Sequence, residues 1–165
     1  MIAFEPGPVL EALQRHRVRF VIIGGFAAIL HGASYVTFDI DITPDAQTEN
    51  LERLSTALRE LGARVWSTGI DEGLAFDHDA ASLARSGVWN LVTPHGRLDI
   101  SFVPNGTTGF VDLDAGAEEH VVVGVPVRVA SLADIVRSKE AAGRTKDLLV
   151  LPTLRRLLDE RYPER

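Results

Sequence analysis

Two aspartates one residue apart are the part of this sequence best suited to metal chemistry. Asp39 and Asp41 lie in the alternating segment 36–43, and side chains two residues apart on a strand point to the same face. Strand rise places the two carboxylates about 7 Å apart, so both could reach divalent cations above that face. The other face is apolar and is expected to anchor the strand in the core; it consists of Phe38, Ile40 and Ile42.

A third carboxylate, Asp99, occurs in a second alternating segment, Arg97-Leu98-Asp99-Ile100-Ser101. Mg²⁺ prefers hard oxygen ligands, and in two-metal phosphoryl transfer the ions lie roughly 3.5–4 Å apart. The sequence has no cysteine, which excludes thiolate nucleophiles and Cys-ligated zinc or iron–sulfur sites. Asp39, Asp41 and Asp99 are therefore the predicted Mg²⁺ ligands, and a solvated acidic strand face is the alternative.

A pair of glycines, Gly24-Gly25, follows the β-branched run 18–23 and precedes a short predicted helix at 26–31. Exposed backbone N–H groups at such a turn hold a phosphate where side chains would prevent close approach. A Gly-Gly pair alone is typical of a simple turn. Followed by two aspartates at this spacing, it predicts a site for a phosphate group and metal.

Cations gather near the C-terminus, where one predicted helix ends and the next begins. Lys139 and Gly143 lie four residues apart on one helix face, and Arg144 and Lys146 follow at the junction. Three positive charges near one point suit a triphosphate, whose charge metal ions neutralise only in part. Asp147 is either functional or a favourable acid at the start of the second helix. Ordinary solvated cations at a surface junction are the alternative.

The pattern of apolar residues predicts an α/β (α+β) domain, a mixed β-sheet flanked by helices with a C-terminal helical pair. One domain is expected over residues 1–165, with its core at about 8–130 and the C-terminal helices at about 131–162. Helices are predicted at 8–17, 26–31, about 48–61, from Ser131 onward and at about 145–162; strands are predicted at 18–23, 36–43, 88–92, 98–103, 121–123 and 125–129. Residues 64–87 are expected to form loops, with a short helix near 80–85.

The chain has 165 residues, 45% of them hydrophobic, and a net charge of −6. This balance is that of one globular domain with a sizeable core. The longest apolar run, 20–30, is too short to span a bilayer and is interrupted by Gly24-Gly25, and the N-terminus, with Glu5 and Pro6, has no cationic lead into a hydrophobic stretch. A cytoplasmic protein without membrane contact is therefore expected. Residues 39–119 hold fifteen acids against five arginines, but residues 120–165 hold nine cations against six acids. The acidic total therefore does not exclude RNA as a substrate.

Taken together, these motifs resemble the nucleotidyltransferase superfamily with the DNA polymerase β-like fold. That family has a strand ending in Gly-Gly or Gly-Ser, Asp-x-Asp about a dozen residues later, and a third Asp on a following strand. Residues 18–150 carry the likeness, through Ile23-Gly24-Gly25-Phe26-Ala27 and Thr37-Phe38-Asp39-Ile40-Asp41. The stretch Lys-x₄-Arg-x-Lys-Asp at 139–147 narrows the resemblance to the bacterial branch of the AbiEii and mycobacterial MenT toxins.

The resemblance implies roles for most of these residues. Gly24 and Gly25 would hold the triphosphate of an NTP; Asp39, Asp41 and Asp99 would ligate Mg²⁺; Lys139, Arg144 and Lys146 would contact phosphates; and either Asp99 or Asp147 would act on the attacking hydroxyl. It further implies a toxin that transfers a nucleoside monophosphate, with a pyrimidine donor favoured, to the 3′ end of tRNA. A cognate antitoxin and a monomeric state are compatible with it. The sequence departs from the family pattern at Tyr35, where the family has Arg, and at Gly25, where Ser is commoner.

Other interpretations of the same metal site stay open. They are an enzyme that modifies an aminoglycoside or lincosamide, an antitoxin that attaches AMP to a partner protein, and a non-catalytic nucleotide-binding module. A second Asp-x-Asp pair, Asp112 and Asp114, lies among glycines and is interpreted as an acidic loop. Trp66 and Trp89 would stack on a base or, as is more common in a small domain, pack in the core.

Overall fold

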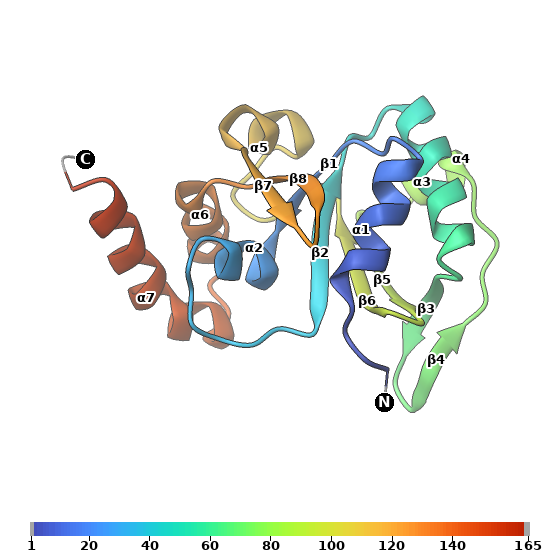
Figure 1. Cartoon of the computed structure of the whole chain (residues 1–165), viewed down its shortest axis with the longest axis horizontal. Helices are drawn as coiled ribbons and strands as arrows, with labels where there is room; N and C mark the ends of the chain where they lie inside the picture. Colours follow the sequence, from blue (N-terminus) through green and yellow to red (C-terminus); the bar gives the residue numbers. More distant parts are fainter. Residues whose placement is uncertain (1, 164–165) are drawn as a thin grey trace.

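The computed structural model describes residues 2–163 and has an alternating order of helices and strands (Figure 1). Along the chain these are α1 (Pro6–Arg15), β1 (Phe20–Ile23), α2 (Gly24–Leu30), β2 (Asp39–Pro44), α3 (Thr48–Glu60), β3 (Arg64–Ser67), β4 (Ile70–Leu74), α4 (Ala80–Ala84), β5 (Val88–Thr93), β6 (Gly96–Ser101), α5 (Phe110–Gly116), β7 (Glu118–Val122), β8 (Val125–Val129), α6 (Leu132–Ala142) and α7 (Thr145–Arg161). The predicted α/β architecture with a C-terminal helical pair is confirmed.

One mixed sheet of eight strands, in the order β4-β3-β5-β6-β2-β1-β8-β7, forms the centre of the molecule. The pairs β2–β6 and β1–β8 are parallel, and the other neighbours are antiparallel. In Figure 1, α1, α3 and α4 gather with β3–β6 on the right half of the view, whereas α2, α6 and α7 occupy the left half. β2 lies in the middle of the sheet, between β6 and β1, and pairs with a neighbouring strand on each side.

The apolar spacing of α3 shows how the helices pack on this sheet. Leu51, Leu54 and Leu58 recur at three- and four-residue intervals, and each is at most 1% exposed. They form one helix face buried in the core, as the sequence predicts. Each such side chain contributes roughly 1.5–3 kcal/mol relative to an exposed position, so this face fixes α3 against the sheet.

Residues 64–74 form a β-hairpin, and the expectation of loops there is wrong. β3 pairs with β5 through Arg64↔Val92, and β4 pairs only with β3 at the edge of the sheet. The hairpin is mostly exposed on both faces, so no apolar alternation marks it in the sequence. Its strands are stabilised by pairing with a segment more than twenty residues away, which local patterns do not reveal.

β2 begins at Asp39, three residues later than predicted, and Phe38 does not anchor it. Ile40 and Ile42 are fully buried, but Phe38 is 70% exposed and Val36 is 77% exposed. The reason is the sheet register, because β2 pairs with β6 only from Asp39 onward. Val36 and Phe38 therefore lie outside the sheet with their side chains exposed to solvent.

The C-terminal helices follow the predicted signals closely. The Ser131 side chain caps α6 by accepting a hydrogen bond from the Asp134 backbone N–H at 3.1 Å, and Gly143 ends the helix with φ 62°. α7 then runs through Pro152. Across the described residues, no helix combines the length and apolarity that crossing a bilayer requires.

The second Asp-x-Asp pair lies on a helix, α5, and not in the expected loop. Asp112 forms an ion pair with Arg137, and Asp114 forms one with Arg128. These pairs tie α5 to α6 and β8. Both carboxylates are therefore engaged in packing the fold, which agrees with the interpretation that they do not form a site.

Candidate functional site

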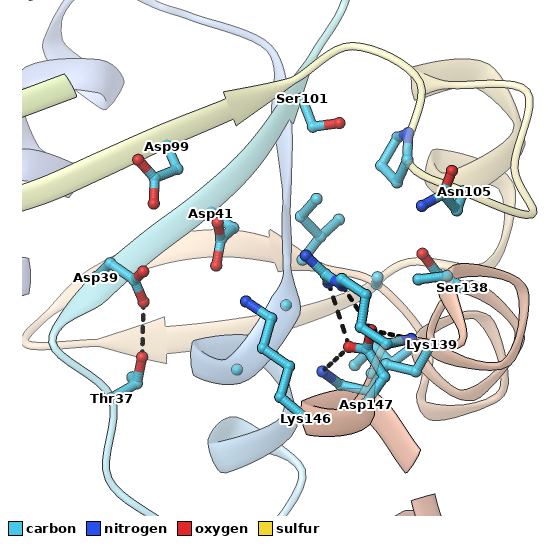
Figure 2. A pocket seen from close by; sticks show the side chains of 18 of the residues that line it. Thr37, Asp39, Asp41, Asp99, Ser101, Asn105, Ser138, Lys139, Lys146 and Asp147 are labelled. Atoms are coloured by element: carbon cyan, nitrogen blue, oxygen red, sulfur yellow. Dashed lines mark hydrogen bonds and ion pairs between the residues drawn. The ribbon is translucent and has the colours of Figure 1, made fainter. Parts of the chain in front are cut away.

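Strand register brings the three predicted metal ligands together. β2 and β6 run parallel with Asp41 beside Asp99, and Asp39 lies two residues before Asp41 on the same face. One carboxylate oxygen from each residue lies within 4.8 Å of the other two. Figure 2 shows the three side chains on these two neighbouring strands. We call Asp39, Asp41 and Asp99 the carboxylate trio.

The trio carries negative charge that the protein only partly balances. Burial, together with the charges of Asp39 and Asp99, raises the pKa of Asp41 to about 7. Burial also raises the pKa of Asp99 to about 6, against the opposing effect of Arg97, which donates to it at 3.1 Å. Thr37 donates to Asp39 at 2.7 Å and orients it. Clustered oxygen ligands with unbalanced charge fit a divalent cation such as Mg²⁺.

Gly24 directly follows the neighbouring strand β1 and begins α2 in a conformation that favours glycine. It has φ 70°, and a β-carbon there would lie 2.5 Å from Oδ2 of Asp41. Gly25 is different, since its β-carbon would come no closer than 3.5 Å to Thr37. The two glycines open α2 beside the trio, and both line the same cleft as the three aspartates.

The junction of α6 and α7 forms the opposite side of the site. Asp147 is fully buried, accepts a hydrogen bond from Arg144 Nε at 2.6 Å, and lies 3.6 Å from Lys139 Nζ. Although burial acts to raise the pKa of Asp147, Arg144 and Lys139 hold it below its ordinary value. Lys146 extends toward the trio in Figure 2, and both lysines act to lower the pKa of Asp41. The junction therefore faces the carboxylates with positive charge.

A cleft of about 710 Å³ separates these two sides. Every predicted site residue lines it, from the glycine pair and the trio to Lys139, Arg144, Lys146 and Asp147. The cleft also includes polar residues that sequence patterns did not select: Asn90, Ser101, Asn105, Asp134 and Ser138. Ser101 and Ser138 lie on the same elements as Asp99 and Lys139, whereas Asn90 reaches the cleft from β5 and Asn105 from the segment after β6.

Tyr35 lies on the cleft wall where the resembled family has Arg. Its ring comes close to Gly25, and its hydroxyl is buried with no hydrogen-bond partner among the described residues. Burial raises its pKa, so the hydroxyl stays protonated at neutral pH. A buried donor without a partner on the wall of a cleft points to a ligand atom that would accept from it.

The tryptophans are placed outside the cleft lining. Trp89 stacks on Phe76 with ring centroids 5.6 Å apart, and its Nε1 donates to the Leu83 carbonyl. Trp66 is covered by the guanidinium of Arg97, 4.7 Å from the ring centroid. Trp89 therefore packs in the fold, and Trp66 supports Arg97, which in turn contacts Asp99.

Comparison with solved structures identifies the fold. The lincosamide adenylyltransferase LnuA, solved with lincomycin bound, superposes with a TM-score of 0.61 at 16% identity, covering 94% of this chain and 99% of that one. The chain has the nucleotidyltransferase fold. ANT(2'')-Ia, solved with adenylyl-2''-tobramycin, gives a TM-score of 0.55 at 19% identity over 89% of this chain and 83% of that one.

A third similar structure is TM1012 from Thermotoga maritima, a candidate nucleotidyltransferase. Its TM-score is 0.54 at 17% identity, covering 96% of this chain and 97% of that one. No protein-family model and no curated protein sequence matches this chain. At these identities the likeness establishes the fold alone.

Proposed function

We propose that this protein is a metal-dependent nucleotidyltransferase. It moves a nucleoside monophosphate from an NTP to an acceptor hydroxyl and releases pyrophosphate. The observation that carries the proposal is the cleft itself, in which the carboxylate trio faces Lys139 and Lys146. A metal-bound triphosphate complements both sides, because the carboxylates hold the cations and the lysines contact the phosphate oxygens.

Asp39, Asp41 and Asp99 would hold Mg²⁺, as their oxygen ligands and charge fit this ion. When bound, such ions stabilise charge on the attacking and leaving oxygens of an in-line displacement. Gly24 and Gly25 bring backbone N–H groups near the phosphates, where a side chain at position 24 would collide with Asp41. These residues position the donor with its α-phosphate beside the trio.

The proton of the attacking hydroxyl goes to Asp99 in this proposal. Its pKa of about 6 suits a base near neutral pH, and it lies in the trio. Asp147 is held by Arg144 and Lys139, so we assign it the role of fixing these cations. The acceptor oxygen then bonds to the α-phosphorus, the bond to the bridging oxygen breaks, and pyrophosphate leaves with its charge balanced by Lys139 and Lys146.

Two classes of acceptor have separate support. The sequence stretch 139–147 resembles the toxin branch, for which the acceptor is the 3′ end of tRNA, a pyrimidine triphosphate is the favoured donor and an antitoxin is the partner. The fold neighbours LnuA and ANT(2'')-Ia instead carry lincomycin and an adenylylated tobramycin, which supports a small hydroxylated acceptor. The second class is accommodated by a cleft of about 710 Å³.

A labelling experiment tests the reaction and separates the acceptors. The protein is incubated with Mg²⁺ and each α-labelled NTP in turn, with total tRNA, lincomycin, tobramycin or a cell-protein extract as acceptor. Transfer to tRNA supports the toxin, transfer to a drug supports the resistance enzyme, and transfer to protein supports the AMP-attaching antitoxin. Asp41→Asn should lose transfer in every case. Failure to bind Mg²⁺–NTP in a titration would overturn the proposal in favour of a partner-binding module.

A further inference from the structure

Two histidines and a glutamate form a second cluster of metal-binding groups, away from the carboxylate trio. His31 follows the end of α2, and Glu118 and His120 lie on β7. One ligand atom from each lies within 4.8 Å of the other two. Among residues 2–163, this cluster and the trio are the two groups of three such side chains that lie this close. The proposed nucleotidyl transfer uses none of its residues.

Hydrogen bonding prepares His31 to act as a ligand. Its Nε2 lies 2.7 Å from the Ala130 carbonyl oxygen, which only accepts, so the proton is on Nε2 and Nδ1 carries the free lone pair. Metal-binding histidines commonly donate their second ring nitrogen to a carbonyl in this way, which fixes the tautomer and the ring.

The spacing of the ligand atoms is close to that of a zinc site. Oε2 of Glu118 lies 3.8 Å from Nδ1 of His31 and 3.7 Å from Nε2 of His120. In a tetrahedral site with bonds of about 2.0–2.1 Å, ligand atoms are separated by roughly 3.3 Å. The ligand atoms of the two histidines lie within 4.8 Å of each other, so side-chain movements of up to roughly 1.5 Å would bring the three atoms to bonding positions. The ligand set, two imidazoles and one carboxylate, is one that Zn²⁺ commonly takes.

Access to the cluster is from one side. The side chain of His31 is fully buried, whereas those of Glu118 and His120 are 30% and 22% exposed. An ion could enter past the two exposed ligands and keep a water molecule in the fourth position. We propose that His31, Glu118 and His120 bind a Zn²⁺ ion that joins the end of α2 to β7.

A protein cation already lies beside this position. Arg161, in the last turn of α7, donates from Nη1 to Nδ1 of His31 at 2.7 Å and from Nη2 to Glu118 at 3.2 Å. Its guanidinium satisfies the lone pair and the charge that the metal would take. The side chain is 42% exposed and lies 6.0 Å from the ring of Tyr162, so it can move into solvent beside that ring. Arg161 therefore competes with Zn²⁺ for the site.

Cobalt spectroscopy on the tag-free 165-residue chain tests this site with a readout independent of activity. The Asp41→Asn variant serves as the background, because it weakens metal binding by the trio. One equivalent of Co²⁺ should give the intense visible absorption of a tetrahedral site, and Zn²⁺ should abolish it. In this background, His120→Ala should weaken Zn²⁺ binding by at least about tenfold, and Glu118→Gln should weaken it as well.

Arg161→Ala should change Zn²⁺ affinity in the opposite direction to the substitutions at His120 and Glu118. Because it removes the competing cation, it should tighten Zn²⁺ binding by about three- to tenfold. His95→Ala is the matched control, since His95 pairs with Glu5 at a surface turn, and its affinity should stay within about twofold of the background. The site is ruled out if no tetrahedral Co²⁺ band forms, if His120→Ala binds Zn²⁺ as tightly as the background, or if Arg161→Ala weakens binding. Thermal melts without metal establish that each variant is folded.

Discussion

Gly24 faces Asp41 so closely that a β-carbon at position 24 would lie 2.5 Å from the carboxylate oxygen Oδ2. The next glycine along the chain is not constrained in this way, since a β-carbon on Gly25 would meet Thr37 at 3.5 Å. The two members of the motif therefore have different physical roles. The first permits the metal ligand and the backbone turn to lie together, and the second mainly keeps the start of α2 open.

Alanine at each glycine separates these roles. Gly24→Ala should displace Asp41 and strain a backbone with φ 70°, lowering the free energy of unfolding by about 1–3 kcal/mol and removing Mg²⁺–NTP binding. Gly25→Ala is the matched control and should keep its stability within about 1 kcal/mol. Isothermal titration with Mg²⁺–NTP and denaturant unfolding measure both effects. Equal behaviour of the two variants would contradict the close approach of Gly24 to Asp41.

Asp41→Asn should stabilise the metal-free protein at high pH. The folded-state pKa of Asp41, about 7, lies above its ordinary value of 3.8, so between these values the folded state binds more protons than the unfolded state. Stability without metal therefore falls as pH rises through this range. The amide carries no charge, and we expect the free energy of unfolding at pH 8 in chelator to rise by on the order of 2 kcal/mol.

The control for this effect is Asp114→Asn. Asp114 pairs with Arg128 on the surface of the fold, so its replacement should leave stability unchanged or lower it. The gain from Asp41→Asn should also shrink as the pH is lowered toward 5, where Asp41 is already protonated in the folded protein. A gain that does not depend on pH would show that charge crowding in the trio is not its cause.

Asparagine at Asp147 and at Asp99 should have opposite effects on stability. Asp147 is buried between Arg144 and Lys139, so Asp147→Asn breaks a buried ion pair and should cost about 2–4 kcal/mol. Asp99→Asn relieves repulsion within the trio and should keep or raise the free energy of unfolding while removing nucleotidyl transfer. Urea unfolding and the labelled-NTP assay, run on both variants, distinguish a fixing role from a catalytic one. If Asp99→Asn transfers nucleotide nearly as fast as the parent, Asp99 is not the group that accepts the proton.

Tyr35→Phe tests whether the orphan hydroxyl contacts the nucleotide. Removing a buried polar group that has no protein partner should leave stability unchanged or raise it by about 1 kcal/mol. If the hydroxyl donates to the bound nucleotide, affinity for Mg²⁺–NTP should fall by about five- to tenfold, equivalent to one hydrogen bond. Tyr162→Phe, near the end of α7, is the control and should keep its affinity. Unchanged affinity in Tyr35→Phe would assign the residue a packing role only.

The residues that could be predicted from the sequence are those whose neighbours in the chain decide their environment. The three aspartates of the trio alternate with buried residues on short strands. The glycine pair lies where a strand ends and a helix begins. Local periodicity therefore predicted which way these residues face. Neither spacing nor the family resemblance predicted that β2 and β6 pair in parallel with Asp41 beside Asp99, because this register is set between distant segments.

What local patterns missed depends on contacts between distant segments. The hairpin at 64–74 is exposed on both faces and is held by β5. Phe38 alternates with buried residues but precedes the point where β6 begins to pair with β2. The cluster of His31, Glu118 and His120 was missed for the same reason, because His31 and His120 lie 89 positions apart. In addition, β7 starts at Glu118, before the three consecutive valines at 121–123 that predicted a strand there.

The opposite charges on the two sides of the cleft couple the binding of metal to the binding of nucleotide. A metal ion alone neutralises the trio but removes the attraction between the trio and Lys139 and Lys146, whereas a free nucleotide satisfies the lysines but is repelled by the trio. Each component thus improves the binding of the other, and thermodynamic linkage makes this enhancement reciprocal. The two walls together select the preformed metal–nucleotide chelate, so binding should be cooperative although the protein provides a single cleft for both.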